Sequence, residues 1–316
     1  DGIVTIVLPH GVLFRGGEEG TIRKNLIDHN NIDAIIGLPA NIFFGTGIPT
    51  IIMVLRKNKK DSDVLIIDAS KGFEKDGKNN KLRACDIKRI VDAYKERPEK
   101  IEKFARRVSR AEIVQNDYNL NIPRYVDSSE KAESWDIYAS MFGGIPEAEL
   151  QDLSAYWTAF PHLKAALFSP DNEAYCRLNV ANLKNAVLSH PDVVAFKTAF
   201  QNAFGDFDAY LKSALIDGMT QLNAAGEEER LSREIFARLA GIPLVDRYAA
   251  YQLLDDDWKK IAIDLEIIQT EGFAATKQVD PNMVLKKDAE VQDGWVGHVL
   301  PFELVQSVKM HEEVAA

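Results

Sequence analysis

The sequence of 316 residues contains only two cysteines and no long hydrophobic run. Cys85 and Cys176 lie far apart and outside any CxxC or Cys/His cluster, which argues against a disulfide framework and against a zinc site. No stretch reaches the roughly 18 apolar residues of a membrane span, and the N-terminus lacks the basic flank and cleavage site of a signal peptide. The sequence therefore predicts no membrane contact, and the cytoplasm is the expected location.

Local motifs of hydrolytic, metal-dependent or nucleotide chemistry are missing too. The six histidines form no HxH or HExxH pattern, and no GxSxG elbow is present. Two glycine-containing loops occur, FRGGEEG at residues 14–20 and FGTGIP at residues 44–49. Only the first precedes an expected helix, and its Glu18 and Glu19 suit a helix N-terminus but would repel a phosphate. Neither loop is a dinucleotide-binding fingerprint, and no metal site is expected.

What is present describes about two globular domains, with 46% hydrophobic and 27% charged residues. The chain starts without methionine inside an expected buried strand, so we expect a fragment of a longer fold. The N-terminal part favours an α/β sheet, with a helix at residues 21–29 and strands at residues 3–8, 32–38, 50–55 and 64–68. The second and third strands should pair antiparallel, because the loop between them is too short for a parallel crossover.

Beyond residue 81 the pattern becomes helical, first around Ile87 to Tyr94 and then in a second helix expected from Pro98 to residue 115. After residue 126 no strong strand pattern returns for over about a hundred residues. An apolar helical stripe runs from Val193 to Leu215 behind a cap-like Ser-His-Pro-Asp sequence, and we expect it to be core. The expected fold class is therefore α/β followed by a mainly α-helical domain, with domains at residues 1–125 and 126–316.

Positive charge is concentrated in one part of the chain. Residues 51–125 hold 19 of the 38 Lys and Arg residues against 12 acidic ones, in a chain of net charge −10. A basic segment in an acidic chain is typical of a protein that touches phosphates with one face. The candidates for DNA phosphate contact are Lys88, Arg89, Arg106, Arg107 and Arg110. The alternative is a solvated helix face, which is the common role of such charge runs.

A family resemblance is carried by residues 7–59, VLPHGVLFRGGEEGTIRKNLIDHNNIDAIIGLPANIFFGTGIPTIIMVLRKNK. This stretch resembles the modification subunit of type I restriction-modification systems, an adenine-N6 DNA methyltransferase. Later segments, including DLEIIQTEGF and VQDGWVGHVLPFELVQ, are similar to the same family, so the likeness reaches both ends of the chain. The resemblance implies a methyltransferase sheet whose last strands include a reversed hairpin, here at residues 32–55.

The loop PANIFFGTGIP would then lie at the catalytic mouth, because α/β enzymes bind ligands at the carboxyl ends of their strands. In similar enzymes the target adenine is flipped out of the duplex and an aromatic side chain stacks on it. Phe44 is the preferred stacking residue, and Phe43 is a second candidate with a more core-like position. Gly45 and Gly47 would supply room and backbone freedom. The alternative is that both phenylalanines close the hydrophobic core.

Two motifs of the family are absent from residues 1–316, namely the cofactor-binding glycine motif and [Asn/Asp]-Pro-Pro-[Phe/Tyr]. The resemblance implies that the intact subunit uses S-adenosylmethionine, whereas none is expected bound to this fragment. The tetrapeptide would stabilise the charge that develops on the adenine amino group. We therefore assign no catalytic residue in this fragment and expect no methyl transfer from it alone.

The resemblance implies DNA, a specificity subunit and, in the full complex, a restriction subunit as partners. Residues 126–316 carry 16 basic against 31 acidic side chains, which suits protein contact better than duplex binding. Trp295 and Phe302 are the candidate interface anchors, unless they dock onto their own domain. The alternative function is a non-catalytic, methyltransferase-like binding module that scaffolds a restriction-modification complex. A single-chain restriction enzyme would need a nuclease segment further upstream.

Overall fold

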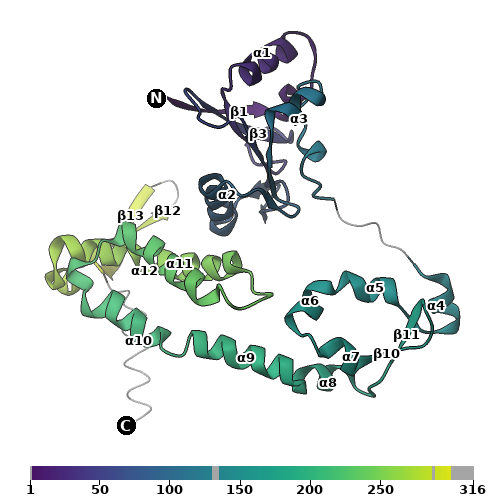
Figure 1. The fold of residues 1–316 in the computed structure, drawn as a ribbon. Coiled ribbons are helices and arrows are strands. Elements are labelled where there is room, and N and C mark those ends of the chain that lie inside the picture. The colour runs from purple at the N-terminus through teal and green to yellow at the C-terminus, as the bar shows by residue number, and fades with distance from the viewer. Residues whose placement is uncertain (1, 130–134, 287–288, 300–316) are drawn as a thin grey trace. The chain divides into compact units, whose positions relative to one another are not determined.

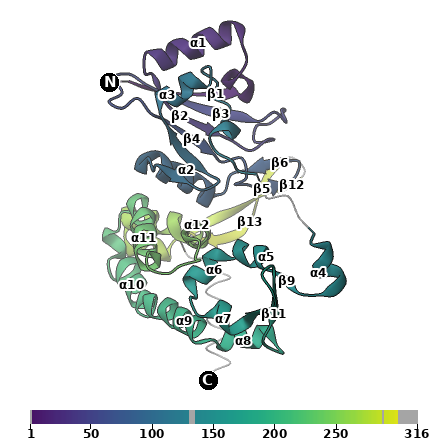
Figure 2. The ribbon, with the colours of Figure 1, turned by 45° about the vertical axis from the view of Figure 1, so that its right-hand side comes forward.

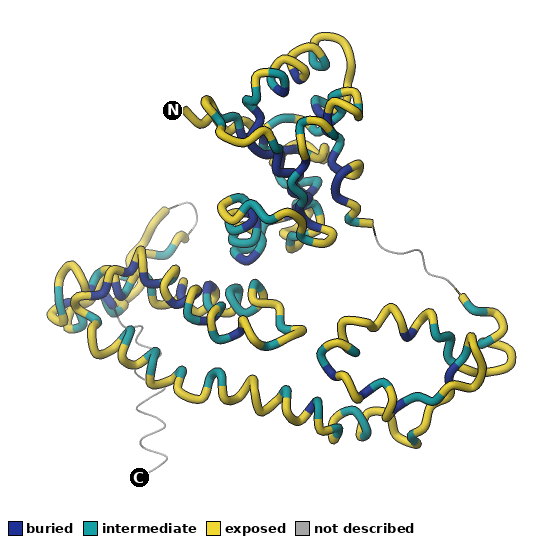
Figure 3. Tube along the Cα trace, in the orientation of Figure 1, coloured by how far each residue is buried: buried dark blue, intermediate teal, exposed yellow. Residues whose placement is uncertain are grey.

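The computed structural model describes residues 2–129, 135–286 and 289–299 of the chain. It divides into two compact units, residues 1–134 and residues 135–316 (Figure 1). Buried residues occur in both units, and Figure 3 shows them as dark blue stretches of the trace. Each unit therefore has hydrophobic clusters of its own.

Unit 1 is built on a six-stranded sheet with the strand order β1-β3-β2-β4-β8-β7. β2 pairs parallel with β4, and β3 lies antiparallel between β1 and β2, with Ile35 opposite Met53. The predicted antiparallel hairpin is thus confirmed. The strands are β1 (Ile3–Pro9), β2 (Ile32–Gly37), β3 (Thr50–Arg56), β4 (Val64–Asp68), β7 (Lys100–Ile101) and β8 (Ala105–Val108).

The central strands are buried on both faces because their sequences are almost continuously apolar. Side chains alternate along β4, so Ile66 packs on one face of the sheet and Ile67 on the other. A bulge between Ile32 and Ala34 breaks this alternation in β2 and leaves Ile32 and Ile35 in the same cluster. Two separate clusters therefore sandwich the sheet.

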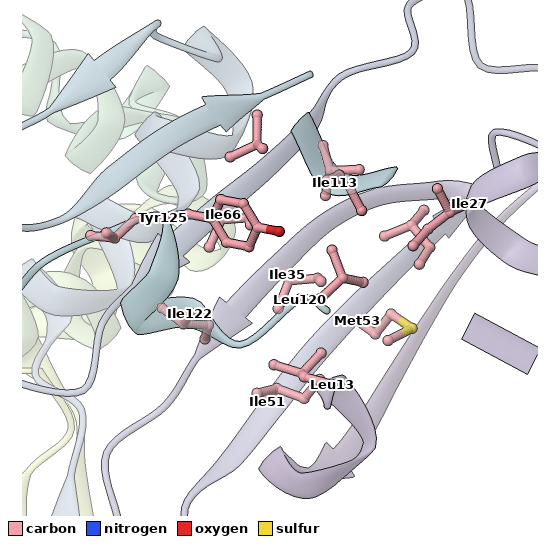
Figure 4. Packing of buried hydrophobic residues seen from close by; sticks show 14 residues of the cluster. Leu13, Ile27, Ile35, Ile51, Met53, Ile66, Ile113, Leu120, Ile122 and Tyr125 are labelled. Atoms are coloured by element: carbon pink, nitrogen blue, oxygen red, sulfur yellow. The ribbon is translucent and has the colours of Figure 1, made fainter. Parts of the chain in front are cut away.

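Helices cover both faces of this sheet, and Figure 2 shows α1 and α2 on opposite sides of it. One face carries α1 (Gly17–Asp28) and α3 (Arg110–Gln115), where Ile27 joins the cluster drawn in Figure 4. The other face carries α2 (Ala84–Glu96), which contributes Ile90. The expected α/β class is confirmed. Four short elements complete the unit: η1 (His10–Leu13), β5 (Glu74–Asp76), β6 (Asn79–Lys81) and η2 (Ile122–Arg124).

The helix expected from Pro98 to residue 115 is wrong over most of its length. α2 ends at Glu96. The residue after it, Arg97, has a left-handed backbone with φ 46°, and the chain then forms β7 and β8 before the short α3. β8 pairs antiparallel with β4, with Ala105 opposite Ile67. This pairing satisfies backbone groups of a buried strand that a helix would have left open. Similarly, α1 begins at Gly17, four residues before the expected start.

β1 is a strand as predicted, but it is not buried. Ile3, Val4 and Val7 are 56%, 53% and 49% exposed. The physical reason is its place at the end of the sheet, because among the described residues β1 pairs with β3 alone. A strand with one neighbour covers fewer of its side chains than a central strand does.

Unit 2 is mainly helical, as predicted, but it also contains short strands that the sequence pattern did not reveal. Strands of two to four residues are too short to show an alternating pattern. Its first elements are α4 (Ile137–Phe142), β9 (Ile145–Pro146), α5 (Glu147–Asp152), α6 (Ser154–Ala159), α7 (Leu163–Leu167), β10 (Phe168–Pro170), β11 (Tyr175–Leu178) and α8 (Leu183–Ser189). Then follow α9 (Pro191–Ala203), α10 (Phe207–Leu211), a π-helix (Lys212–Asp217), η4 (Met219–Gln221), α11 (Ala224–Leu239), α12 (Arg247–Glu271), η5 (Phe273–Lys277), β12 (Val279–Lys286) and β13 (Ala289–Gly297).

The apolar stripe between Val193 and Leu215 does not form one continuous core face. Val193 and Phe196 pack with Leu163 in a cluster around α7. Leu211 and Leu215 instead pack in a cluster that includes Trp258 of α12. The stripe therefore contributes to two clusters, because α9 ends at Ala203 before α10 begins.

Candidate functional site

The loop between β2 and β3, residues 38–49, lies at the carboxyl ends of the parallel strands. The backbone N–H of Leu38 donates to Thr50 O at 2.9 Å, so the base of the loop continues the hairpin. Just past the end of β4, the backbone N–H of Ala69 donates to Gly37 O at 2.9 Å. The loop therefore projects from the edge at which open α/β sheets bind ligands.

Two aromatic side chains stand out of this loop. Phe44 is 96% exposed and Phe43 is 38% exposed, and among the described residues neither ring joins a buried cluster. Phe43 is therefore not the core residue that its position suggested. Covering an exposed apolar ring with another apolar surface lowers the free energy, because both surfaces are removed from water. The flat face of a base is such a surface.

The two glycines of the loop fulfil different requirements. Gly45 has a φ of 82°, which lies in the left-handed region that side-chain-bearing residues rarely adopt. Gly47 does not share this backbone angle. A Cβ at Gly47 would lie 3.0 Å from Oδ1 of Asn41, so Gly47 allows the close approach of that side chain. Gly45 thus has a backbone angle that favours glycine, whereas Gly47 supplies space.

Asn80 holds the first residues of the loop, and sequence analysis missed it. Its side-chain Nδ2 donates to Ala40 O at 2.6 Å, and its backbone N–H donates to Asn41 O at 2.8 Å. Asn80 is only 6% exposed and lies on β6 of the β5–β6 hairpin. A weak signal for that hairpin was present, because Asp-Gly at residues 76–77 is a preferred turn sequence.

Two titratable groups at the same edge complete the site. Burial lowers the pKa of His10, which directly follows β1, and the negative charge of Asp68 partly offsets this shift. The imidazole is therefore neutral at pH 7. Asp68 ends β4 and is engaged at both oxygens, by the backbone N–H of Ser70 (3.0 Å) and the hydroxyl of Ser128 (2.5 Å). Asp68 thus fixes local geometry rather than offering a free base.

The five predicted phosphate contacts do not form one stripe. Lys88 and Arg89 lie on α2, whereas Arg110 lies on α3, which covers the opposite face of the sheet. Arg106 and Arg107 are neighbours on β8 and so point to opposite faces. The second expected helix, which would have carried Arg106, Arg107 and Arg110 together, is replaced by β7, β8 and the short α3.

Each of these five side chains already has a partner within unit 1. Nζ of Lys88 lies 3.0 Å from Asp92, and the guanidinium of Arg89 lies 4.1 Å from the centre of the Phe104 ring. The three other arginines meet carboxylates: Arg106 binds both oxygens of Glu112, Arg107 binds Glu99 and Asp63, and Arg110 binds Asp28. A phosphate would have to compete with these partners, so contact through the five residues stays a prediction.

The described residues do not fit the contacts that S-adenosylmethionine needs. The one glycine-rich loop that runs into a helix precedes α1, whose first turn carries Glu18 and Glu19. Asp68, the carboxylate at the strand ends, already accepts a hydrogen bond at each oxygen. We therefore assign no cofactor contact to this chain. Within the described ranges no group of three or more His, Cys, Asp or Glu residues could hold a metal ion.

The predicted partner anchors lie at the end of unit 2. Trp295 is 58% exposed on β13, and Phe302 lies outside the described residues. An apolar surface at α4 was missed, although Ile137, Met141 and Phe142 are each at least 70% exposed. The sequence WDIYASMF did contain the signal, because its apolar residues follow one another too closely for a single buried face. No helix among the described residues is long and apolar enough to cross a membrane.

Comparison with known proteins finds relatives for the part of the chain that forms the sheet and its loop. Residues 1–134 match the family model described as N-6 DNA methylase. The methylase subunit of the type I restriction enzyme MpnII from Mycoplasma pneumoniae is 41% identical over 138 residues, which cover 43% of this chain and 25% of that protein. The corresponding subunit of MjaVII from Methanocaldococcus jannaschii is 44% identical over 140 residues, covering 42% and 24%.

A crystal structure of a type I restriction-modification methyltransferase subunit from Streptococcus thermophilus is 57% identical in sequence. It matches with a TM-score of 0.40, over 40% of this chain and 27% of that one. The chain thus spans about a quarter of the length of the curated relatives that it matches. The sequence matches confirm the resemblance read from the sequence for this part of the chain: residues 1–134 are similar to N-6 DNA methylases of the form found in type I restriction-modification methylase subunits.

Proposed function

We propose that this chain is part of the modification subunit of a type I restriction-modification complex. The intact subunit transfers the methyl group of S-adenosylmethionine to N6 of adenine in DNA. The observation that carries the proposal is the match of residues 1–134 to N-6 DNA methylases, together with identities above 40% to type I methylase subunits. The proposed location of the complex is the cytoplasm.

In this proposal the loop at residues 38–49 receives the flipped adenine. Phe44 stacks on the face of the base and Phe43 borders it, while Gly45 and Gly47 keep the approach open. The support is the nearly complete exposure of Phe44 at the ligand-binding edge of the sheet. Stacking of a base on an aromatic ring contributes about 1–3 kcal/mol, which offsets part of the cost of unstacking the base.

Residues 1–316 alone are proposed to be inactive. The sequence contains neither the glycine motif for the cofactor nor a Pro-Pro pair. DNA, a specificity subunit and a restriction subunit are the proposed partners. Unit 2 is the proposed subunit-interaction domain, with Trp295 as an exposed anchor.

The test uses the full-length subunit co-purified with its specificity subunit. The complex is incubated with unmethylated DNA and S-adenosylmethionine, and N6-methyladenine is quantified by mass spectrometry of the nucleosides. Phe44→Ala should lower the rate about 5- to 150-fold, the equivalent of 1–3 kcal/mol, without changing the melting temperature. Ile48→Ala is the matched control, because Ile48 is a 61% exposed apolar residue of the same loop.

Three outcomes distinguish base stacking by Phe44 from a folding role of Phe44 and from a non-catalytic binding module. A selective loss in Phe44→Ala supports base stacking. A fall in melting temperature with activity retained would assign Phe44 to folding instead. If the wild-type complex binds DNA but never forms N6-methyladenine, the chain belongs to a non-catalytic binding module.

A further inference from the structure

A basic cavity lies at the edge of unit 1 opposite the loop that carries Phe44. It has a volume of about 560 Å³ and is formed where β2 begins, β3 ends and α2 ends. A cavity of this size falls within the range of small-ligand sites. Among the described residues that line it, six are cationic and two are acidic. The cations are Arg56, Lys57, Lys59, Lys60, Lys95 and Arg97.

Both acidic residues of the cavity are already neutralised by internal partners. Asp33 is 3% exposed and is bound by Arg97 Nη1 at 3.0 Å, by Tyr94 Oη at 2.7 Å and by Arg56 Nε at 3.3 Å. Asp61 lies 3.4 Å from the ammonium group of Lys59. Two carboxylates against six cations leave an excess of positive charge in a concave space, where the electrostatic potential is focused.

The turn that carries three of these six cations, Lys57, Lys59 and Lys60, is held by hydrogen bonds. Asn30 Nδ2 donates to Lys59 O at 3.3 Å and to Asp61 O at 2.7 Å. The ammonium group of Lys59 is turned inward, with only 2% of the side chain exposed, and donates to Ile32 O at 3.1 Å and to the carbonyl of Asp63. The turn is therefore preorganised, which lowers the entropic cost of binding a ligand.

Three lysines of the cavity remain available to a ligand. Lys57, Lys60 and Lys95 are exposed, and their ammonium groups make no ion pair within the described parts of the chain. Lys57 and Lys60 come from the β3–β4 turn and Lys95 from the last turn of α2, so they approach the cavity from two elements. Ammonium groups that converge on one hollow are suited to phosphate oxygens.

We propose that this cavity is a phosphate-binding site, in which Lys57, Lys60 and Lys95 contact the ligand and the Asp33 network holds the wall. The phosphate groups belong to a free polyphosphate or nucleotide, or to the backbone of a nucleic acid. The site lies at the amino-terminal edge of the parallel strands, away from the loop of the proposed function. The inference therefore stands independently of methyl transfer.

The experiment compares the intact subunit with two triple variants. Lys57→Gln/Lys60→Gln/Lys95→Gln removes the available charges, and Lys184→Gln/Lys197→Gln/Lys212→Gln removes three exposed lysines of unit 2 as the matched control. Tripolyphosphate binding is measured by isothermal titration calorimetry. Binding of a short duplex is measured by fluorescence anisotropy over a range of salt concentrations, and the melting temperature of each variant confirms folding.

Loss of tripolyphosphate affinity by at least about tenfold in the cavity variant alone supports the site and a free phosphate ligand, since one charged hydrogen bond is worth about 1.5–3 kcal/mol. For the duplex, each lost phosphate contact should reduce the slope of log K against log salt by about 0.9. A reduced slope in the cavity variant alone supports the nucleic-acid backbone as the source. If the two variants match in both measurements, the proposal is overturned and the lysines are merely solvated.

Discussion

The side-chain amide of Asn80 lies 2.6 Å from the carbonyl oxygen of Ala40, across 40 positions of sequence. This bond, with the backbone bond from Asn80 to Asn41, ties the β5–β6 hairpin to the loop that displays Phe44. The residues proposed to face the adenine, Phe43 and Phe44, lie outside this hairpin. Its contribution is to position the loop, and misplacing a reacting group by about 1 Å can cost on the order of 100-fold in rate.

Asn80→Ala is therefore expected to lower the rate of N6-adenine methylation by at least about tenfold in the full-length complex. The affinity for DNA should change much less, because no phosphate or base contact is removed. Single-turnover rates and DNA dissociation constants check this split. Asn79→Ala, the neighbouring substitution on β6, should leave both unchanged. Equal losses in the two variants would show that the hairpin matters only for folding.

The two glycines of the loop should respond differently to substitution. Gly45→Ala places a side chain at φ 82° and should cost about 1–2 kcal/mol, whereas Gly45→Asn should be tolerated better, because asparagine adopts left-handed angles. Methylation rates and thermal unfolding of the full-length complex report these effects. If Ala and Asn at residue 45 behave alike, the backbone angle is not what matters there.

For Gly47 the expected conflict is steric. Gly47→Ala brings a Cβ to 3.0 Å from Oδ1 of Asn41, so the loop must shift and methylation should fall. Asn41→Gly removes that oxygen and keeps the left-handed backbone of residue 41, which has a φ of 56°. The double variant should therefore recover activity relative to Gly47→Ala. A double-mutant cycle of methylation rates measures this coupling, and purely additive effects would contradict it.

The buried carboxylate of Asp33 should stabilise unit 1. Asp33→Ala removes the buried carboxylate that binds Arg56 and Arg97, of which Arg97 keeps only Asp61, at 3.6 Å, among the described carboxylates, and should lower the free energy of unfolding by about 2–3 kcal/mol. Asp61→Ala is the control from the same cavity, since its side chain is 54% exposed and such pairs contribute about 0–1 kcal/mol. Urea unfolding of both variants gives the comparison. Equal losses would mean that burial of Asp33 has no special effect.

Unit 2 should lose stability in acid partly through Glu147. Hydrogen bonds from Lys164, Cys176 and Gln151 lower the pKa of Glu147 from 4.5 to about 2. Because the folded pKa lies below the unfolded one, this stabilisation is present above about pH 4.5 and is lost as the pH falls towards 2. Glu147→Gln should therefore unfold with a weaker pH dependence between these values, as measured by circular dichroism.

A matched substitution at an exposed acid isolates this effect. Glu173→Gln removes one charge from the surface of the same unit without removing a described hydrogen bond. Its acid unfolding profile should follow that of the unchanged chain. A profile for Glu147→Gln that coincides with both would show that the Lys164 contact does not persist in solution.

The sequence predicted the central sheet because its evidence was local. The apolar runs of β2 and β3 and the short loop between them determine an antiparallel hairpin without any knowledge of the rest of the chain. β8 escaped prediction because Ala-Arg-Arg-Val contains too few apolar residues to show a strand pattern. β8 pairs with β4, which lies about 40 residues earlier in the chain. A strand that is stabilised by such a distant partner cannot be predicted from its own four residues.

The family resemblance predicted the exposed position of Phe44. It did not predict the hydrogen bonds by which Asn80 holds the loop of Phe44. Asn80 reads as an ordinary turn residue until the fold brings it to Ala40. The basic cavity was equally hidden, since Lys57 and Lys60 lie far in sequence from Lys95. The charge distribution indicated a basic region but not which of its residues could bind a ligand. In the structure Arg106 and Arg110 form ion pairs with carboxylates, whereas three lysines of the cavity remain available.

The bare outer edge of β1 has a practical consequence for work on this chain by itself. Within the described residues its peptide groups on that side have no strand neighbour, and its valine and isoleucine side chains are open to water. Such an edge is a template for adding a strand from another molecule. Preparations that leave it uncovered should form β-rich aggregates as concentration rises, and dilution or an added charge on β1 should delay them.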